Sequence, residues 1–221
     1  MRALLLALLV AASSLQAADP APVDRNAAYE RVRDSGKVAI LVERAGTELS
    51  RGRNEAALAA ASEAVELAPK NPDALNTKAA ALIKLERYSE AEPLLEEALA
   101  INPDHFDAQF NRAEALFLQG KYSDALAEFR LLFTKYPSRP VLKFKLYLAC
   151  HMAGRDDLAS EVLRTLRFPS DGVAWYYAQA ADKLIANDPR AAKKLLKTAR
   201  AIHPDEAPRY DEALTDAGLL K

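Results

Sequence analysis

The sequence predicts an all-α stack of helix pairs, and three features of its 221 residues carry that prediction. Prolines and alanines recur with a spacing of 34 residues, which is typical of stacked two-helix repeats. Glycines recur between them, with one glutamate in the series. Half of the residues are hydrophobic and only seven are glycine, a composition that favours helices around a continuous core. The recurring positions are Pro69, Pro103 and Pro137; Ala57, Ala91, Ala125 and Ala159; and Gly52, Glu86, Gly120 and Gly154.

Each recurring residue type suits one place in a two-helix repeat. Alanine allows two helices to cross closely, glycine permits the turn between them, and proline disfavours continuation of the second helix. The fullest copies are GRNEAALAAASEAVELAP (52–69), ERYSEAEPLLEEALAINP (86–103) and GKYSDALAEFRLLFTKYP (120–137). These segments resemble the tetratricopeptide repeat family. The resemblance implies a right-handed α-α superhelix whose first helices line a concave groove.

The N-terminus has the layout of a secretory signal peptide. Met1 and Arg2 precede an apolar run from Ala3 to Ala12, and small residues follow at positions 17 and 18. The run is far shorter than the ~20 residues that span a bilayer. We therefore expect cleavage after residue 17, a periplasmic or secreted bacterial protein, and no integral membrane span.

The rest of the chain divides into a leader with a short helix (18–35), a repeat solenoid (36–204) and a C-terminal capping helix (205–221). After residue 139 the pattern weakens, since Tyr147 stands where Ala79 and Ala113 stand in earlier copies. About five helix pairs are expected. They are 37–51 with 55–67, 73–85 with 90–101, 106–119 with 124–135, 139–153 with 157–166, and 174–186 with 189–201, followed by a helix at 208–216.

Composition and motifs argue against several functions. Lys and Arg total 30 against 31 Asp and Glu, so no general attraction to nucleic acid is expected. The three histidines lack metal-ligand spacing, and His105 and His203 read as solvated turn residues. No phosphate-binding loop or acid/base pair is evident, which predicts no enzymatic activity, no metal and no cofactor. The single cysteine, Cys150, fits a small buried hydrophobe.

Alignment on the 34-residue period places candidate binding residues on the first helices. Asn76, Phe110 and Phe144 share one position, and the row continues in the fifth repeat with Tyr176 or Tyr177. Such an apolar, partly aromatic groove suits an amphipathic helix or an extended peptide. The predicted partner-binding residues are Asn76, Phe110, Glu114, Phe117, Phe144, Leu148, His151 and Tyr176.

Two alternatives to an open groove remain at this stage. Helically spaced aromatic residues are often core, and the chain's own segment 18–35 could fill the groove. A clamp for a C-terminal carboxylate is rejected, because only Asn111 and Lys145 match the polar residues that such a clamp requires. The sequence thus predicts a non-enzymatic protein–protein interaction scaffold, in an envelope or secretion assembly. The alternative is a structural subunit of a larger or self-associating complex.

Overall fold

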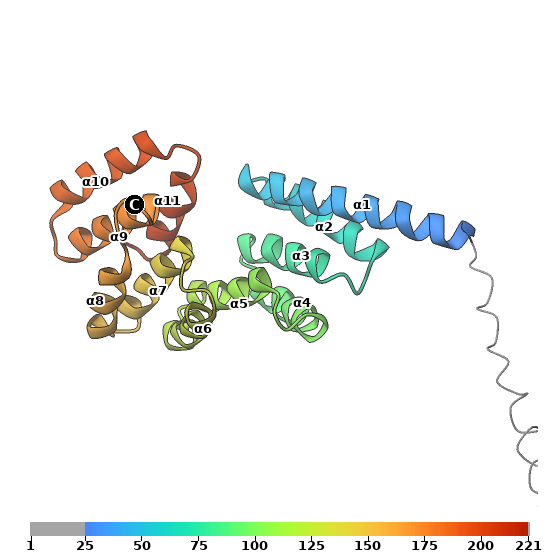
Figure 1. Cartoon of the computed structure of the whole chain (residues 1–221), viewed down its shortest axis with the longest axis horizontal. Coiled ribbons are helices and arrows are strands. Elements are labelled where there is room, and N and C mark those ends of the chain that lie inside the picture. Colours follow the sequence, from blue (N-terminus) through green and yellow to red (C-terminus); the bar gives the residue numbers. More distant parts are fainter. Residues whose placement is uncertain (1–24, 221) are drawn as a thin grey trace, which may run out of the picture.

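The chain is a curved stack of antiparallel helices (Figure 1). The computed structural model describes residues 25–220, with side chains from residue 34, and this part contains eleven α-helices and no β-strand. The predicted signal peptide (1–17) lies outside the described residues. The helices are α1 (Arg25–Ser50), α2 (Asn54–Leu67), α3 (Pro72–Lys84), α4 (Tyr88–Ile101), α5 (Phe106–Leu118), α6 (Tyr122–Lys135), α7 (Pro140–Met152), α8 (Asp156–Thr165), α9 (Gly172–Ile185), α10 (Pro189–Ile202) and α11 (Ala207–Asp216).

The alanines of the 34-residue period lie where the helices of each pair cross. Ala57, Ala91 and Ala125 are completely buried, and Ala159 is 5% exposed. Because alanine is short, the two backbones pack closely and each pair buries one continuous apolar face. From α2 to α11 the observed helix ends lie within two residues of the predicted ones. The predicted all-α solenoid of five pairs and a terminal helix is confirmed.

The first helix differs from the prediction. The sequence suggested a short helix ending near Gly36, whereas α1 continues without a break from Arg25 to Ser50. A glycine inside a helix costs only about 1 kcal/mol relative to alanine, and no proline occurs between residues 25 and 50 to interrupt the helix. Residues 25–35 are therefore part of α1 and do not form a separate helix. None of the helices in the described region is long and apolar enough to cross a membrane.

The turns inside the pairs use one backbone conformation. Gly52, Gly120 and Gly154 have φ near +70°, which glycine adopts without strain. Glu86 occupies the equivalent place with φ of +59°, and so does Asn187 in the fifth repeat. Asn187 stands 33 residues after Gly154 instead of 34. The register slip arises before α9, because α8 has 10 residues where α2, α4 and α6 each have 14, and α9 begins 32 residues after α7.

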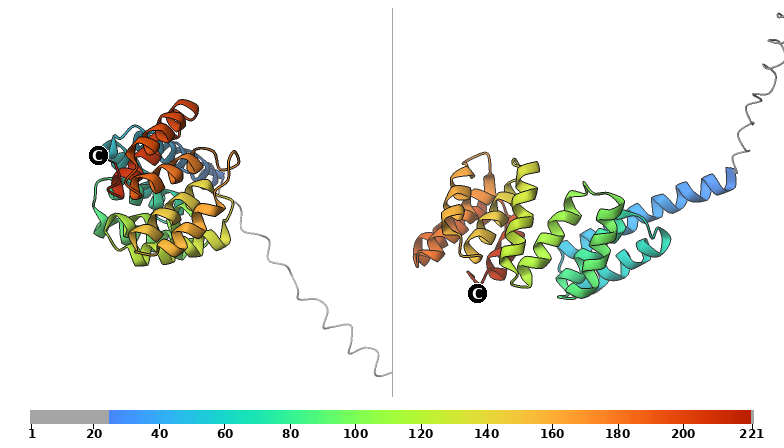
Figure 2. Two further views of the ribbon diagram at one scale, coloured as in Figure 1. Left: turned by 90° about the vertical axis from the view of Figure 1, so that its left-hand side faces the viewer. Right: turned by 90° about the horizontal axis from the view of Figure 1, so that it is seen from below.

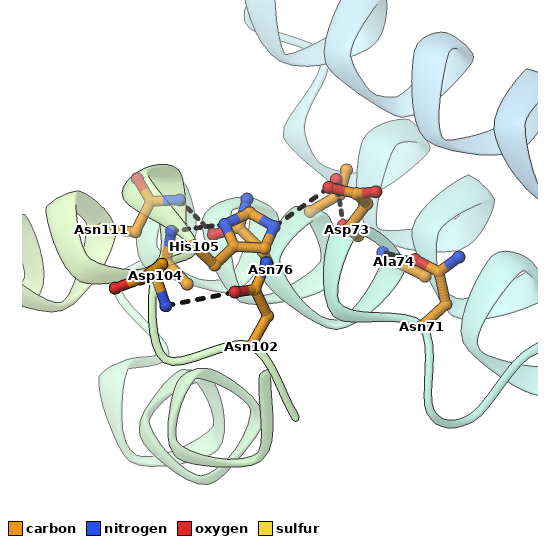
Figure 3. Close-up of polar contacts among 10 residues, drawn as sticks. Asn71, Asp73, Ala74, Asn76, Asn102, Asp104, His105 and Asn111 are labelled. Atoms are coloured by element: carbon orange, nitrogen blue, oxygen red, sulfur yellow. Dashed lines mark hydrogen bonds and ion pairs between the residues drawn. The ribbon is translucent and has the colours of Figure 1, made fainter. Parts of the chain in front are cut away.

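A buried histidine connects the second and third repeats (Figure 3). His105 is 9% exposed, and its Nδ1 accepts a hydrogen bond from the backbone N–H of Ala108, 3.2 Å away, at the start of α5. Its Nε2 lies 3.0 Å from Asp73 Oδ1 on α3. Since Nδ1 accepts, Nε2 carries the proton and donates to the carboxylate. The expectation of a solvated histidine was wrong, because this ring caps one helix and binds another.

The last repeats share a continuous core with the third. The loop after α8 is tied down by Asp171, which is 5% exposed and accepts hydrogen bonds from Lys143 Nζ at 2.8 and 3.0 Å. Cys150 is completely buried in the same core, and burial raises the pKa of its thiol to about 11. A thiol with that pKa is almost entirely protonated at neutral pH, so Cys150 acts as a small apolar residue.

The turn positions yield a first test. Gly120→Ala should lower the free energy of unfolding by about 1 kcal/mol, because a side chain at positive φ is strained. The added Cβ would meet no atom within 4 Å, so the whole cost comes from the backbone. Glu86→Gly relieves the same strain and should change stability by less than about 0.5 kcal/mol. Urea unfolding followed by circular dichroism measures both. Equal losses in the two variants would contradict a left-handed Glu86.

The buried histidine yields a second test. His105→Ala removes both the helix cap and the bond to Asp73, and should destabilise the protein by about 1–2 kcal/mol. His105→Asn keeps a capping acceptor and should recover about half of that loss. His151→Ala, at an exposed pair with Asp156, is the control and should cost under about 0.5 kcal/mol. The unfolding midpoints of the three variants measure these losses. If His105→Asn were as unstable as His105→Ala, the hydrogen bond from the Ala108 N–H to His105 would not contribute to stability.

Candidate partner-binding groove

The first helices of the repeats and the last helix surround one cavity. It has a volume of about 470 Å³ and is lined from α1, α3, α5, the start of α7 and α11. The cavity is lined by first helices of the repeats, α1, α3, α5 and α7, and the stack that carries it is elongated, with α1 at one end and the C-terminal helices at the other (Figure 2). The helix α11 closes the inner layer on one side, so the cavity is a short groove and not a channel running the length of the stack.

Polar bridges join neighbouring helices across the floor of this groove. Asn111 Nδ2 on α5 donates to Asn76 Oδ1 on α3 at 2.8 Å (Figure 3). Lys145 Nζ on α7 donates to Glu114 Oε1 on α5 at 2.5 Å, and both side chains are buried. Each bridge links two consecutive repeats, so the bridges fix the spacing of the inner helices.

A third bridge connects the two ends of the groove. Lys84 Nζ at the end of α3 lies 2.8 Å from Glu212 Oε1 on α11. Asp216, one turn further along α11, lies at the groove wall, where partial burial raises the pKa of its carboxyl and the nearby Glu114 carboxylate adds to the effect. The wall that α11 supplies thus contains two carboxylates, Glu212 and Asp216, beside Arg209, and an ion pair joins it to Lys84 of the second repeat.

One buried oxygen in the groove has no partner. Glu114 Oε2 is buried and accepts no hydrogen bond from any described residue, although Oε1 of the same carboxylate binds Lys145. An unsatisfied buried carboxylate oxygen costs about 1–3 kcal/mol, more if charged. A donor entering from the groove would remove this cost.

The opposite side of the groove is aromatic and cationic. Phe106 and Phe110 stack with ring centroids 5.9 Å apart, and we call this pair the aromatic shelf. The guanidinium of Arg139 lies 3.9 Å from the centroid of the Phe106 ring. Arg139 is exposed and forms no ion pair within residues 34–220. A cation on an aromatic face, without a carboxylate partner, remains available to an anionic group.

Three of the predicted binding residues come together in this groove. Asn76 and Glu114 lie on its floor, and Phe110 is part of the aromatic shelf. Asn76 and Glu114 are each 9% exposed, so their polar ends face the groove from largely buried positions. Phe110 also packs against the buried Phe129, with centroids 5.6 Å apart, so it serves both the groove and the core.

Three others belong to the core instead, which corrects the expectation that they face an open groove. Phe144 and Leu148 are completely buried and Phe117 is 1% exposed. Phe144 is buried because Tyr210 on α11 packs against both Phe144 and Tyr177, with ring centroids 5.1 and 5.3 Å away. The inner face of the last repeats is thus filled by the C-terminal helix of the chain itself. The predicted alternative, filling by segment 18–35, falls largely outside the described side chains.

The remaining two predicted residues lie away from the cavity. His151, at the end of α7, has Nδ1 at 2.8 Å from Asp156 Oδ1 and contacts the start of α8. Tyr176 packs with Trp175 and Phe168, at centroid distances of 5.1 and 5.8 Å. The one-residue uncertainty in the fifth repeat is resolved in favour of Tyr177, which continues the inner row and donates a hydrogen bond to Asp211 of α11.

Sequence reasoning missed the contribution of α11 and of Arg139. Residues of α11 have no equivalent in earlier repeats, so alignment on the period could not place them. The sequence predicts Arg139 only as the first residue of a helix, and gives no sign that its guanidinium lies over the ring of Phe106. The rejected carboxylate clamp remains unsupported, because the charge of Lys145 is neutralised by Glu114.

Comparison with known proteins supports the fold. Models of the tetratricopeptide repeat match residues 48–96 and 76–140. A tetratricopeptide repeat protein from Parabacteroides merdae is 21% identical, with 82% of this chain and 71% of that chain covered and a TM-score of 0.66. A thermophilic repeat protein of Thermus thermophilus is 21% identical, with coverages of 80% and 99% and a TM-score of 0.67.

A third structure, Pseudomonas aeruginosa PilF, is 18% identical, with coverages of 82% and 91% and a TM-score of 0.59. No curated protein sequence matches the chain. At these identities the solved structures establish the solenoid fold, and the family models establish the type of repeat. Residues 48–140 of this chain are tetratricopeptide repeats.

Proposed function

We propose that this chain is a non-enzymatic scaffold that binds a short segment of a partner protein in the groove, within an envelope or secretion assembly. Tetratricopeptide repeat proteins generally serve as protein-interaction scaffolds, whose stacks present extended concave surfaces. The observation that carries the proposal is the composition of the groove. The aromatic shelf, the unpaired Arg139 and the unsatisfied Glu114 oxygen all border the same cavity.

These groups define the chemistry of the segment. An apolar side chain would lie on the aromatic shelf, a main-chain or side-chain N–H would donate to Glu114, and a carboxylate would pair with Arg139. A helix about 10 Å across occupies roughly 400–500 Å³ per turn, so the cavity takes about one turn or a short extended segment. The closure by α11 favours a short segment over a long helix laid along the stack.

The site of action is proposed from the N-terminal sequence. The signal-peptide pattern of residues 1–17 supports export, and with it a role in the bacterial envelope or outside the cell. The chain would then fold in an oxidising compartment with one buried cysteine, which allows no internal disulfide.

Filling the groove tests the binding proposal. Ala80 on α3 borders the cavity and is partly exposed, so Ala80→Arg inserts a long side chain without removing a core group. A displayed peptide library is selected on the wild-type protein, and affinities of synthetic peptides are measured by calorimetry. We expect Ala80→Arg to weaken binding at least about 10-fold, or about 1.4 kcal/mol.

The matched control is Ala59→Arg, the same change at an exposed position on α2, which should leave affinity unchanged. Equal binding by Ala80→Arg and wild type would place the peptide elsewhere. Selection of no peptide at all would contradict the proposed function.

Export has its own test. Intact mass spectrometry of the protein purified from its native host should show a chain beginning at residue 18, because cleavage is expected after Ala17. A mass that includes residues 1–17, found in the cytosolic fraction, would overturn the proposed localisation and leave the groove proposal standing.

A further inference from the structure

The outer helix of the last repeat carries an isolated strip of positive charge. The sequence of α10, PRAAKKLLKTARAI, contains five basic residues and no acidic one. Arg190, Lys193, Lys194 and Lys197 are exposed and follow the spacing i, i+3, i+4, i+7, which puts them on one helix face. We call these four residues the basic strip. At 1.5 Å per residue the strip is roughly 10 Å long.

The fold does not use this strip. None of its four side chains forms an ion pair within the described part of the chain, whereas the fifth cation, Arg200, binds Asp211 at 2.7 Å. The buried face of α10 is apolar, through Ala192, Leu196 and Ala199. Like charges at these spacings destabilise a helix by about 0.2–0.5 kcal/mol per pair. Contact with an external anionic surface would relieve this repulsion.

The outer helices at the other end of the stack have the opposite charge. Together α2 and α4 contain seven glutamates, three in α2 and four in α4, and no Lys or Arg. Glu63 pairs with Lys37 and Glu90 with Arg87, which leaves five glutamates that are exposed and without an ion pair. These five, the acidic surface, are Glu55, Glu66, Glu92, Glu96 and Glu97.

We infer that the basic strip of one copy docks on the acidic surface of a second copy, outer helix against outer helix. In Figure 1, α10 lies at the left of the molecule, whereas α2 and α4 of the first two repeats lie to the right of centre, so one molecule cannot join its own two surfaces. Different surfaces meet in this contact, which makes it head-to-tail. The inference is independent of the groove, since the outer helices lie on the other side of each repeat.

A second copy fits the charges better than a polyanion does. The whole chain has a formal net charge of −1, so the residues outside α10 sum to −6 when its +5 is subtracted. A membrane of anionic lipid or a nucleic acid would attract the strip and repel most of the remaining molecule. A second copy supplies a compact acidic surface matched to the strip.

The test compares neutralised variants of the two surfaces by sedimentation velocity. The mature wild-type protein should associate as its concentration rises in 20 mM NaCl and dissociate in 300 mM NaCl, since exposed charge pairs are screened by salt. Lys193→Gln/Lys197→Gln and Glu92→Gln/Glu96→Gln should each be monomeric alone. Mixed together they should form a 1:1 dimer, because each retains the surface that the other has lost. The control Lys70→Gln/Lys121→Gln removes two exposed lysines elsewhere and should associate like the wild type.

Three results would overturn the inference. The wild type could stay monomeric in low salt at high concentration. The two variants could fail to associate when mixed. Vesicles containing phosphatidylglycerol could bind wild type and Glu92→Gln/Glu96→Gln but not the lysine variant, without self-association, which would identify a membrane as the partner of the strip.

Discussion

The close crossing of two helices at a buried alanine is the contact on which the stack is built. It recurs at Ala57, Ala91, Ala125 and Ala159, and it requires a short side chain because a larger one would separate the backbones. Once each pair is closed in this way, its first helix lies inside the curve and its second helix outside. The protein thereby gains two chemically separate surfaces: an inner groove of aromatic and bridged polar residues, and an outer layer whose charge changes sign from α4 to α10.

Most of the fold could be predicted because its signals are local. Proline, glycine and alanine occur at the helix ends, turns and crossings of the repeats. Their positions predict the bounds of α2 to α11. The continuity of α1 could not be predicted in this way, since the cost of Gly36 in a helix is small enough for packing to decide.

The groove was predicted only in part, for a different reason. Asn76, Phe110 and Glu114 follow from the period, because inner positions repeat with it. The burial of Phe144 and Leu148 depends on α11, and the position of α11 depends on tertiary contacts of Tyr210 that no repeat encodes. His105 is a similar case: a polar residue in a turn gives no sign of whether it meets solvent or, as here, Asp73 of the preceding repeat.

The packing of Tyr210 against Phe144 and Tyr177 also limits where the chain can gain a repeat. A repeat duplicated after α10 would require Tyr210 to leave the surface on which the next inner helix must pack. A repeat duplicated between α4 and α5 would leave that contact untouched and only lengthen the regular half. It would, however, separate Lys84 from Glu212 by one repeat, which would break the ion pair that joins α3 to α11 across the groove. Duplication can therefore add repeats only in the interior of the array. The groove, which α11 now closes on one side, would become longer and open with each added repeat.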